Sequence, residues 1–230
     1  MAIEIRLEGR LGTAPDEISS EWFHRQMITA RGGDATLLVN SPGGDFFTGT
    51  TIYNELRRHV GTTTALVQGM AASAASLAIM GCDRIIMGAG ALLMLHRSSG
   101  LTVGSQADHA DMAELLATID RQMAGIYANR TGLPSARIEE MMEAETWLTG
   151  EEALALGFCD SVWQAAPKKQ AAALVAQAAA MGTRYQFRNM IAAISALDRG
   201  AAIAEAVKMH PQSAKMTTKT ESGVNDDVAS

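Results

Sequence analysis

The residue of this chain whose position best suits a nucleophile is a serine at the start of a predicted helix. Ser73 lies in the small-residue segment 69–76 (GMAASAAS), and the pattern predicts a helix from Ala71 to Met80. A serine in the first turn of a helix lies beside free backbone N–H groups at the positive end of the helix dipole. Those groups could bind the oxyanion of an attacked carbonyl, and small neighbours would let a substrate backbone approach. The alternative is that Ser73 simply caps the helix.

A nucleophilic serine needs a general base, and His96 is the best placed histidine. It follows a predicted apolar strand over residues 92–95, so its side chain could project from the strand end into a cleft. A carboxylate must then orient the imidazole, and Glu145 or Glu143 could do so. The alternatives are structural, because a histidine after a strand often only packs and acidic residues before a helix are often only solvated.

A third feature is a glycine-rich turn at residues 40–45 (NSPGGD), directly after the apolar run 36–39. Pro42 fixes one φ angle, and the paired glycines allow φ values that are closed to other residues. Such a turn can aim a backbone N–H at a ligand instead of into a sheet. The alternative is a plain loop.

Strands and helices must alternate along the chain to position these residues. Predicted strands cover residues 3–7, 36–39, 63–67, 84–87 and 92–95, and predicted helices cover 19–30, 50–59, 71–80, 108–129, 135–142 and 150–156. This alternation favours an α/β fold of stacked β-α-β units with a mainly parallel sheet. The long helix carries an apolar stripe wider than a small domain can bury alone. The stripe consists of Met112, Leu115, Leu116, Ile119, Met123 and Ile126.

Charge divides the chain of 230 residues into two parts. Residues 1–164 contain eleven Arg, twenty Asp or Glu and no Lys, whereas residues 165–230 contain every Lys and have a net charge of +3. We therefore predict a folded domain over 1–164 and an Ala-rich, basic C-terminal extension over 165–230. The extension is expected to form a helix over 190–209 and to end in a disordered segment.

Composition excludes several classes of protein. The net charge of −6 gives no electrostatic footprint for nucleic acid or an anionic membrane. Two cysteines make no disulfide framework, no apolar stretch approaches a membrane span, and the N-terminus lacks the plan of a signal peptide. The expected location is therefore the cytoplasm.

Several motifs together resemble the proteolytic subunit of the Clp protease family. They are residues 69–73, His96 at a strand end, the turn 40–44, and residues 145–153 (ETWLTGEEA) followed by Leu156-Gly157. All stand in family order, and the resemblance runs from about Ile3 to Val162. It implies a β-spiral of repeated β-α-β units, with the long helix projecting as a handle.

The resemblance also implies a role for each site residue. Ser73 matches the nucleophile and His96 the general base, while Glu145 stands where the family usually has the Asp of the triad. Gly44 and Ala74 match the two backbone donors of the oxyanion hole. Glu143 stays open as a substitute for Glu145.

The implied function is a serine endopeptidase that cleaves polypeptides through an acyl-enzyme and needs neither a metal nor an organic cofactor. The handle implies a homo-oligomeric ring or barrel. ATP would enter only through a partner Clp ATPase, since the chain has no Gly-x-x-x-x-Gly-Lys phosphate loop.

Within the family, the chain looks most like the head maturation proteases of tailed phages. The short N-terminus, the pair Asp45-Phe46, the sequence Glu-Thr-Trp-Leu-Thr at 145–149 and the C-terminal extension carry this likeness. It implies capsid or scaffold proteins as partners, and the host cytoplasm or the procapsid as location. The alternative within the family is a housekeeping subunit that works with a Clp ATPase in protein degradation.

Three other classes are weaker interpretations. Signal-peptide peptidases of this fold use a Ser-Lys dyad, but this chain has no lysine before Lys168. Crotonase-type acyl-CoA enzymes share the fold and two oxyanion N–H groups, yet have no need of a serine with a matching histidine. The non-enzyme alternative is an oligomeric assembly or scaffold protein with an inactive site.

Overall fold

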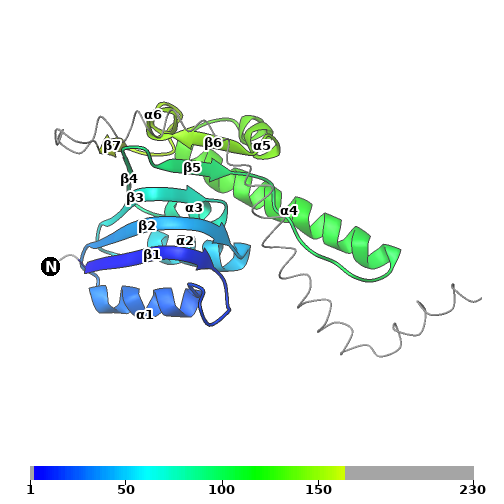
Figure 1. The fold of residues 1–230 in the computed structure, drawn as a ribbon, viewed down its shortest axis with the longest axis horizontal. Helices are drawn as coiled ribbons and strands as arrows, with labels where there is room; N and C mark the ends of the chain where they lie inside the picture. The colour runs from blue at the N-terminus through cyan, green and yellow to red at the C-terminus, as the bar shows by residue number, and fades with distance from the viewer. Residues whose placement is uncertain (1–2, 164–230) are drawn as a thin grey trace, which may run out of the picture. The chain divides into compact units, whose positions relative to one another are not determined.

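The computed structural model describes residues 3–163, in which strands and helices alternate for most of the length (Figure 1). In chain order these elements are β1 (Ile3–Leu11), α1 (Ser20–Ala30), β2 (Ala35–Gly44), α2 (Phe46–Arg58), β3 (Thr63–Ala72), α3 (Ala74–Ile79), β4 (Arg84–Gly88), β5 (Leu92–Leu95), α4 (Gln106–Thr131), α5 (Ser135–Glu143), β6 (Thr146–Thr149), α6 (Gly150–Ala155) and β7 (Ser161–Trp163). The predicted extension 165–230, with its helix over 190–209, lies outside the described residues, so it and the boundary near residue 165 stay predictions.

One sheet joins the seven strands of residues 3–163. Its main path runs β1-β2-β3-β4-β7 with every neighbouring pair parallel, and β5 also runs parallel to β3. Only β6 runs antiparallel, against β5. The prediction of an α/β fold with a mainly parallel sheet of β-α-β units is confirmed.

The two halves of β3 pair with different strands on the same side, and this arrangement brings the site residues together. The first half of β3, residues 64–67, pairs with β4, whereas Met70 to Ala72 pair with β5. The carboxyl ends of β1, β2, β3 and β5 therefore come to neighbouring places along one edge. Residues that follow these strands lie close together even when they are distant in sequence.

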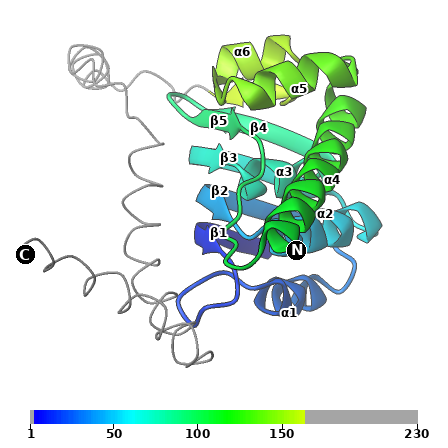
Figure 2. The same ribbon diagram turned by 90° about the vertical axis from the view of Figure 1, so that its right-hand side faces the viewer.

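Helices α1, α2 and α3 cover one face of the sheet, and α4 extends along its edge beyond β5 (Figures 1 and 2). The apolar residues that alternate along β2 and β3 are buried beneath them: Leu37, Val39, Ala65 and Val67 are all fully inaccessible. Ile52 and Leu56 on α2 pack into the same core. The alternating apolar residues of β2 and β3 and the apolar face of α2 thus account for the packing of these helices on the sheet.

Two segments differ from their predicted structure. The predicted turn at 41–44 is the end of β2, because Gly43 and Gly44 still pair with β1 across an irregular register while adopting φ values of 84° and 146°. The predicted helix start at Ala71 is also wrong, since Ala71 and Ala72 pair with β5 and α3 begins at Ala74. Alanine has a high helix propensity, but pairing with two neighbouring strands outweighs that local preference here.

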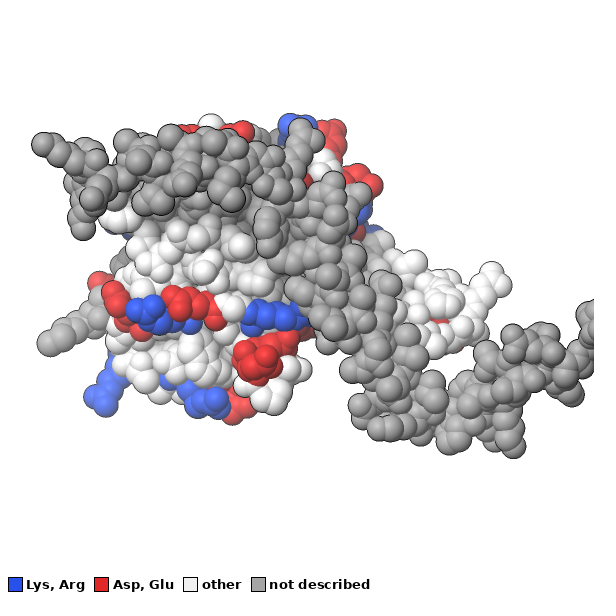
Figure 3. Space-filling view, in the orientation of Figure 1, with Lys and Arg blue, Asp and Glu red and all other residues white. Residues whose placement is uncertain are grey.

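Charges of both signs are mixed on the surface of the described residues. Figure 3 shows a row of alternating acidic and basic side chains, and exposed Glu4, Arg6, Glu8 and Arg10 alternate along β1. Among residues 3–163, no helix has both the length and the hydropathy needed to cross a membrane.

Candidate active site

Ser73 occupies the sharp junction between β3 and α3. Its φ of 55° and ψ of −127° are rare for a residue with a side chain, and its N–H donates to the Met94 carbonyl at 2.9 Å. The side chain makes no capping hydrogen bond to α3, so the capping role considered from the sequence is wrong. A strained strand-to-helix turn of this kind presents a hydroxyl outward from the sheet edge.

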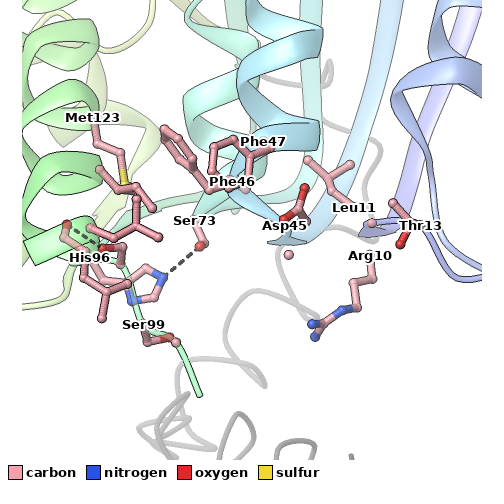
Figure 4. A pocket seen from close by; sticks show the side chains of 18 of the residues that line it. Arg10, Leu11, Thr13, Asp45, Phe46, Phe47, Ser73, His96, Ser99 and Met123 are labelled. Atoms are coloured by element: carbon pink, nitrogen blue, oxygen red, sulfur yellow. Dashed lines mark hydrogen bonds between the residues drawn. The ribbon is translucent and has the colours of Figure 1, made fainter. Parts of the chain in front are cut away.

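His96 reaches Ser73 because β5 lies beside the end of β3. The imidazole Nε2 lies 2.7 Å from the Ser73 Oγ, and the two side chains point toward each other (Figure 4). With Nε2 unprotonated, the hydroxyl donates this hydrogen bond, which is the arrangement required for transfer of the serine proton. The structure thus brings together two residues that are 23 positions apart in the sequence.

Glu145 lies next to His96 through the pairing of β5 with β6. Leu95 pairs with Thr146 in this antiparallel ladder, so the residues that follow and precede them lie opposite each other. Glu145 itself has a left-handed φ of 48°. Burial lowers the pKa of the His96 imidazole, and the negative charge of Glu145 offsets part of that lowering.

Glu143 is placed differently. It is the last residue of α5, and its carboxylate accepts a hydrogen bond from the Arg97 guanidinium. Glu143 and Glu145 therefore do not lie on one extended segment, because the end of α5 separates them. Glu143 is engaged with a cation, while Glu145 acts on His96.

Burial sets the protonation state of His96. It lowers the pKa of the imidazole below its ordinary value, and the negative charges of Glu145 and Asp120 offset this only in part. A histidine with a lowered pKa is neutral at neutral pH and stays neutral further into the acidic range. Its Nε2 can therefore accept a proton there.

A groove of about 500 Å³ contains Ser73 and His96. Apolar side chains from two helices form much of its wall: Phe46 and Phe47 on α2, and Met112, Leu115, Leu116, Ile119 and Met123 on α4. Five of the six residues of the predicted apolar stripe therefore line this groove. Arg10, Glu17 and Asp45 supply charged groups to the lining.

The family model described as Clp protease matches residues 13–166. The chain belongs to the Clp protease family. It is 34% identical over 131 residues to the ATP-dependent Clp protease proteolytic subunit 1 of Mycobacterium leprae, a match covering 56% of this chain and 66% of that protein. Subunit 1 of Protochlamydia amoebophila is 29% identical over 155 residues, covering 66% of this chain and 74% of that protein. Thus the chain spans slightly less than two thirds of the length of the mycobacterial relative.

The family resemblance assigns two backbone donors, and both lie at the groove. Gly44 and Ala74 line it beside Ser73. Ala74 is the first residue of α3, so its N–H precedes the first hydrogen bond inside the helix. Donation to an oxyanion by these two groups stays a prediction.

Gly43 explains why the end of β2 lies so close to the nucleophile, and sequence reasoning did not single it out from the glycine pair. A Cβ at Gly43 would come within 2.4 Å of the Ala72 carbonyl oxygen and 2.9 Å of the Ser73 Cβ. Its φ of 84° is also unfavourable for any residue with a side chain. Glycine at this position lets β2 pack directly against the β3–α3 junction.

Ser76 is fully buried, and its Oγ lies within hydrogen-bond distance of the carbonyls of Ser73 and Met94 and of the Tyr127 hydroxyl. These contacts give Ser76 a packing role. No group of three or more metal-ligating side chains occurs among the residues that the structure describes.

Sequence reasoning missed Arg97 and Asp120. Asp120 is 8% exposed, on the same side of α4 as Leu116 and Met123, and it accepts hydrogen bonds from the segment that follows His96. An acidic residue between apolar positions three and four residues away was the signal that could have found it. Arg97 carried no comparable signal.

Proposed function

We propose that this protein is a serine-type endopeptidase acting on polypeptides. The observation that carries the proposal is the 2.7 Å contact between Ser73 Oγ and His96 Nε2 inside an apolar groove. Membership of the Clp protease family supports it. The groove has the size and apolar wall expected for a site that binds part of an extended chain.

In the first half of the reaction, His96 Nε2 takes the proton of the Ser73 hydroxyl while Oγ attacks the carbonyl carbon of the scissile bond. The N–H groups of Gly44 and Ala74 bind the oxyanion that forms. When the carbon–nitrogen bond breaks, His96 returns the proton to the leaving amine. Glu145 stabilises the imidazolium throughout.

In the second half, water replaces the amine. His96 removes a proton from the water, the resulting oxygen nucleophile attacks the ester of Ser73, and the acid product leaves as Ser73 Oγ recovers its proton. Each step uses groups of this chain and needs no metal or organic cofactor.

A fluorophosphonate probe tests the proposal directly. Its phosphorus should bond to Ser73 Oγ with loss of fluoride, and peptide mapping should find the adduct on residue 73 alone. Prior protonation of His96 at acidic pH should slow labelling. An unlabelled Ser73 in a folded protein would favour the inactive assembly or scaffold protein.

We further propose that the subunits form a homo-oligomeric ring. Leu115 on α4 is 45% exposed, and Leu101 and Val103 in the segment before α4 are 54% and 74% exposed. Exposed apolar side chains grouped around one long helix are typical of a surface that another subunit covers. A second copy of the chain is the occupant we propose.

The substrate context has two candidates. Residues 145–149 (ETWLT) and the pair Asp45-Phe46 favour a prohead maturation protease of a tailed phage, acting on capsid or scaffold proteins in the host cytoplasm or the procapsid. The mycobacterial relative is described as an ATP-dependent Clp protease subunit, which favours degradation with a Clp ATPase. Capsid and portal genes beside this gene would support the first candidate, and an unfoldase gene the second.

The C-terminal extension provides another prediction. If the active enzyme trims this extension, mass spectrometry should find a shortened C-terminus in the wild type but the full mass in the Ser73→Ala variant. Deletion of residues 184–230 should leave peptide hydrolysis unchanged, because no proposed triad or oxyanion residue lies there. Identical full-length masses in both proteins would contradict trimming.

A further inference from the structure

An ion cluster anchors the chain immediately after His96. Arg97 contacts two carboxylates: its Nη1 donates to Asp120 Oδ2 at 3.2 Å, and its Nε donates to Glu143. Asp120 Oδ1 also accepts the backbone N–H of Ser98 at 2.7 Å. The cluster thus joins the segment after β5 to both α4 and α5.

Asp120 is unusual in this group because its side chain is nearly buried, with 11% of its surface exposed. A buried carboxylate is costly unless hydrogen bonds and a counter-charge compensate it. Here each oxygen has a partner, and both partners belong to residues that directly follow His96. An apolar side chain would fill this position on α4 at lower cost, so the charge calls for an explanation beyond packing.

A shared backbone carbonyl also links this ion cluster to Glu145. The Met142 oxygen accepts the N–H of Arg97 and also the N–H of Glu145, both at 3.2 Å. The residue after the proposed base and the proposed triad acid are therefore attached to one peptide group at the end of α5. A displacement of the anchor would move His96 and Glu145 together.

We propose that Asp120 and Arg97 are positioning residues that hold His96 against Ser73, a role that rests on the proposed peptidase function. Asp120 fixes the backbone at Ser98 and the guanidinium of Arg97. Arg97 in turn engages Glu143, which keeps that carboxylate away from the imidazole. His96 then stays oriented between Ser73 and Glu145.

The proposal also predicts a change in the acidity of His96. The groups that act on its ring include Ser73 from the β3–α3 junction, Glu145 from the segment before β6 and Asp120 from α4, with Arg97 adjacent in the chain. The negative charge of Asp120 raises the pKa of His96. Its replacement by the neutral amide of Asn should therefore lower that pKa and leave the positive Arg97 less compensated.

The test compares Asp120→Asn with Asp111→Asn, which makes the same charge change at an exposed position on α4. For Asp120→Asn we expect kcat for a fluorogenic peptide to fall on the order of 10- to 100-fold, as for a small misplacement of a catalytic group. KM should change much less, and the acid limb of kcat/KM should move to lower pH. Asp111→Asn should match the wild type in all three.

A second measurement needs no activity. The Cε1 proton of each histidine exchanges slowly with deuterium at a rate that depends on protonation, so mass spectrometry against pH gives the pKa of His96 by itself. We expect a lower pKa in Asp120→Asn than in Asp111→Asn. An unlabelled Ser73 in the wild type would overturn the proposed peptidase, whereas equal His96 pKa values in the two variants would overturn the positioning role.

Arg97 supplies a check that does not depend on the buried site tolerating Asn. Arg97→Ala should reduce kcat, and Arg97→Lys should recover only part of it, since an ammonium lacks the fork that contacts two carboxylates at once. Circular dichroism should show all variants folded. Unchanged kcat in Arg97→Ala would contradict the proposal.

Discussion

Replacing Ser73 with alanine should abolish peptide hydrolysis while folding and assembly stay intact. The expected loss in kcat is on the order of 10⁴-fold or more, by comparison with triad deletions in other serine enzymes. The hydroxyl contacts His96, and the side chain makes no capping hydrogen bond to α3, so its removal should cost the fold little. Peptide hydrolysis, with circular dichroism and ultracentrifugation on the same samples, measures all three properties.

Ser76→Ala is the matched control, one turn further along α3. Its buried hydroxyl has three neighbouring polar groups, so its loss should destabilise the protein by about 1–3 kcal/mol. Activity should persist at temperatures where this variant is folded. If Ser73→Ala retained more than about a tenth of the activity, the nucleophile would be another residue.

The pairing of Ser73 with His96 was predictable because each follows an apolar strand of a parallel sheet. Such strands end at one edge, so residues just past them meet there whatever their separation in sequence. The contact of 2.7 Å agrees with that expectation. The sequence did not indicate that β3 pairs with β4 along its first half and with β5 at its end. This pairing places β5 beside the junction that carries Ser73.

The errors at 41–44 and 71–72 share one cause. Glycine, proline and alanine indicate turns and helices by local preference, yet these residues pair with neighbouring strands. Pairing is a property of distant segments, and no local pattern reports it. For the same reason the short strands β6 and β7 were not predicted, although β6 places Glu145 beside His96.

The ion cluster formed by Arg97 and Asp120 could not be predicted from the sequence either. It joins residues from three elements, and a single chain gives no indication of which arginine contacts which carboxylate. The apolar stripe on α4 was predicted from its spacing, but the groove that five of its six residues line was not. That the stripe also packs against another subunit stays a prediction.

Glu145→Gln should reduce kcat strongly, on the order of 10³- to 10⁴-fold, because an amide neither stabilises the imidazolium nor holds the required tautomer. The change also removes a charge that raises the pKa of His96, so the acid limb of kcat/KM should move to lower pH. Steady-state rates across the acidic and neutral range measure both effects. KM should change little if the groove itself is intact.

Glu143→Gln is the control for the same change two residues away. Its carboxylate is 69% exposed and pairs with Arg97, and exposed ion pairs contribute only about 0–1 kcal/mol. Some loss of kcat is expected through Arg97, but far less than for Glu145→Gln. If the two effects were reversed, Glu143 would be the acid of the triad and the alignment with the family motif would be shifted by two residues.

Glu145→Asp distinguishes the effect of the charge from the effect of side-chain length. It keeps the carboxylate but shortens the side chain by one methylene, so an intermediate kcat would show that the longer side chain is fitted to this site.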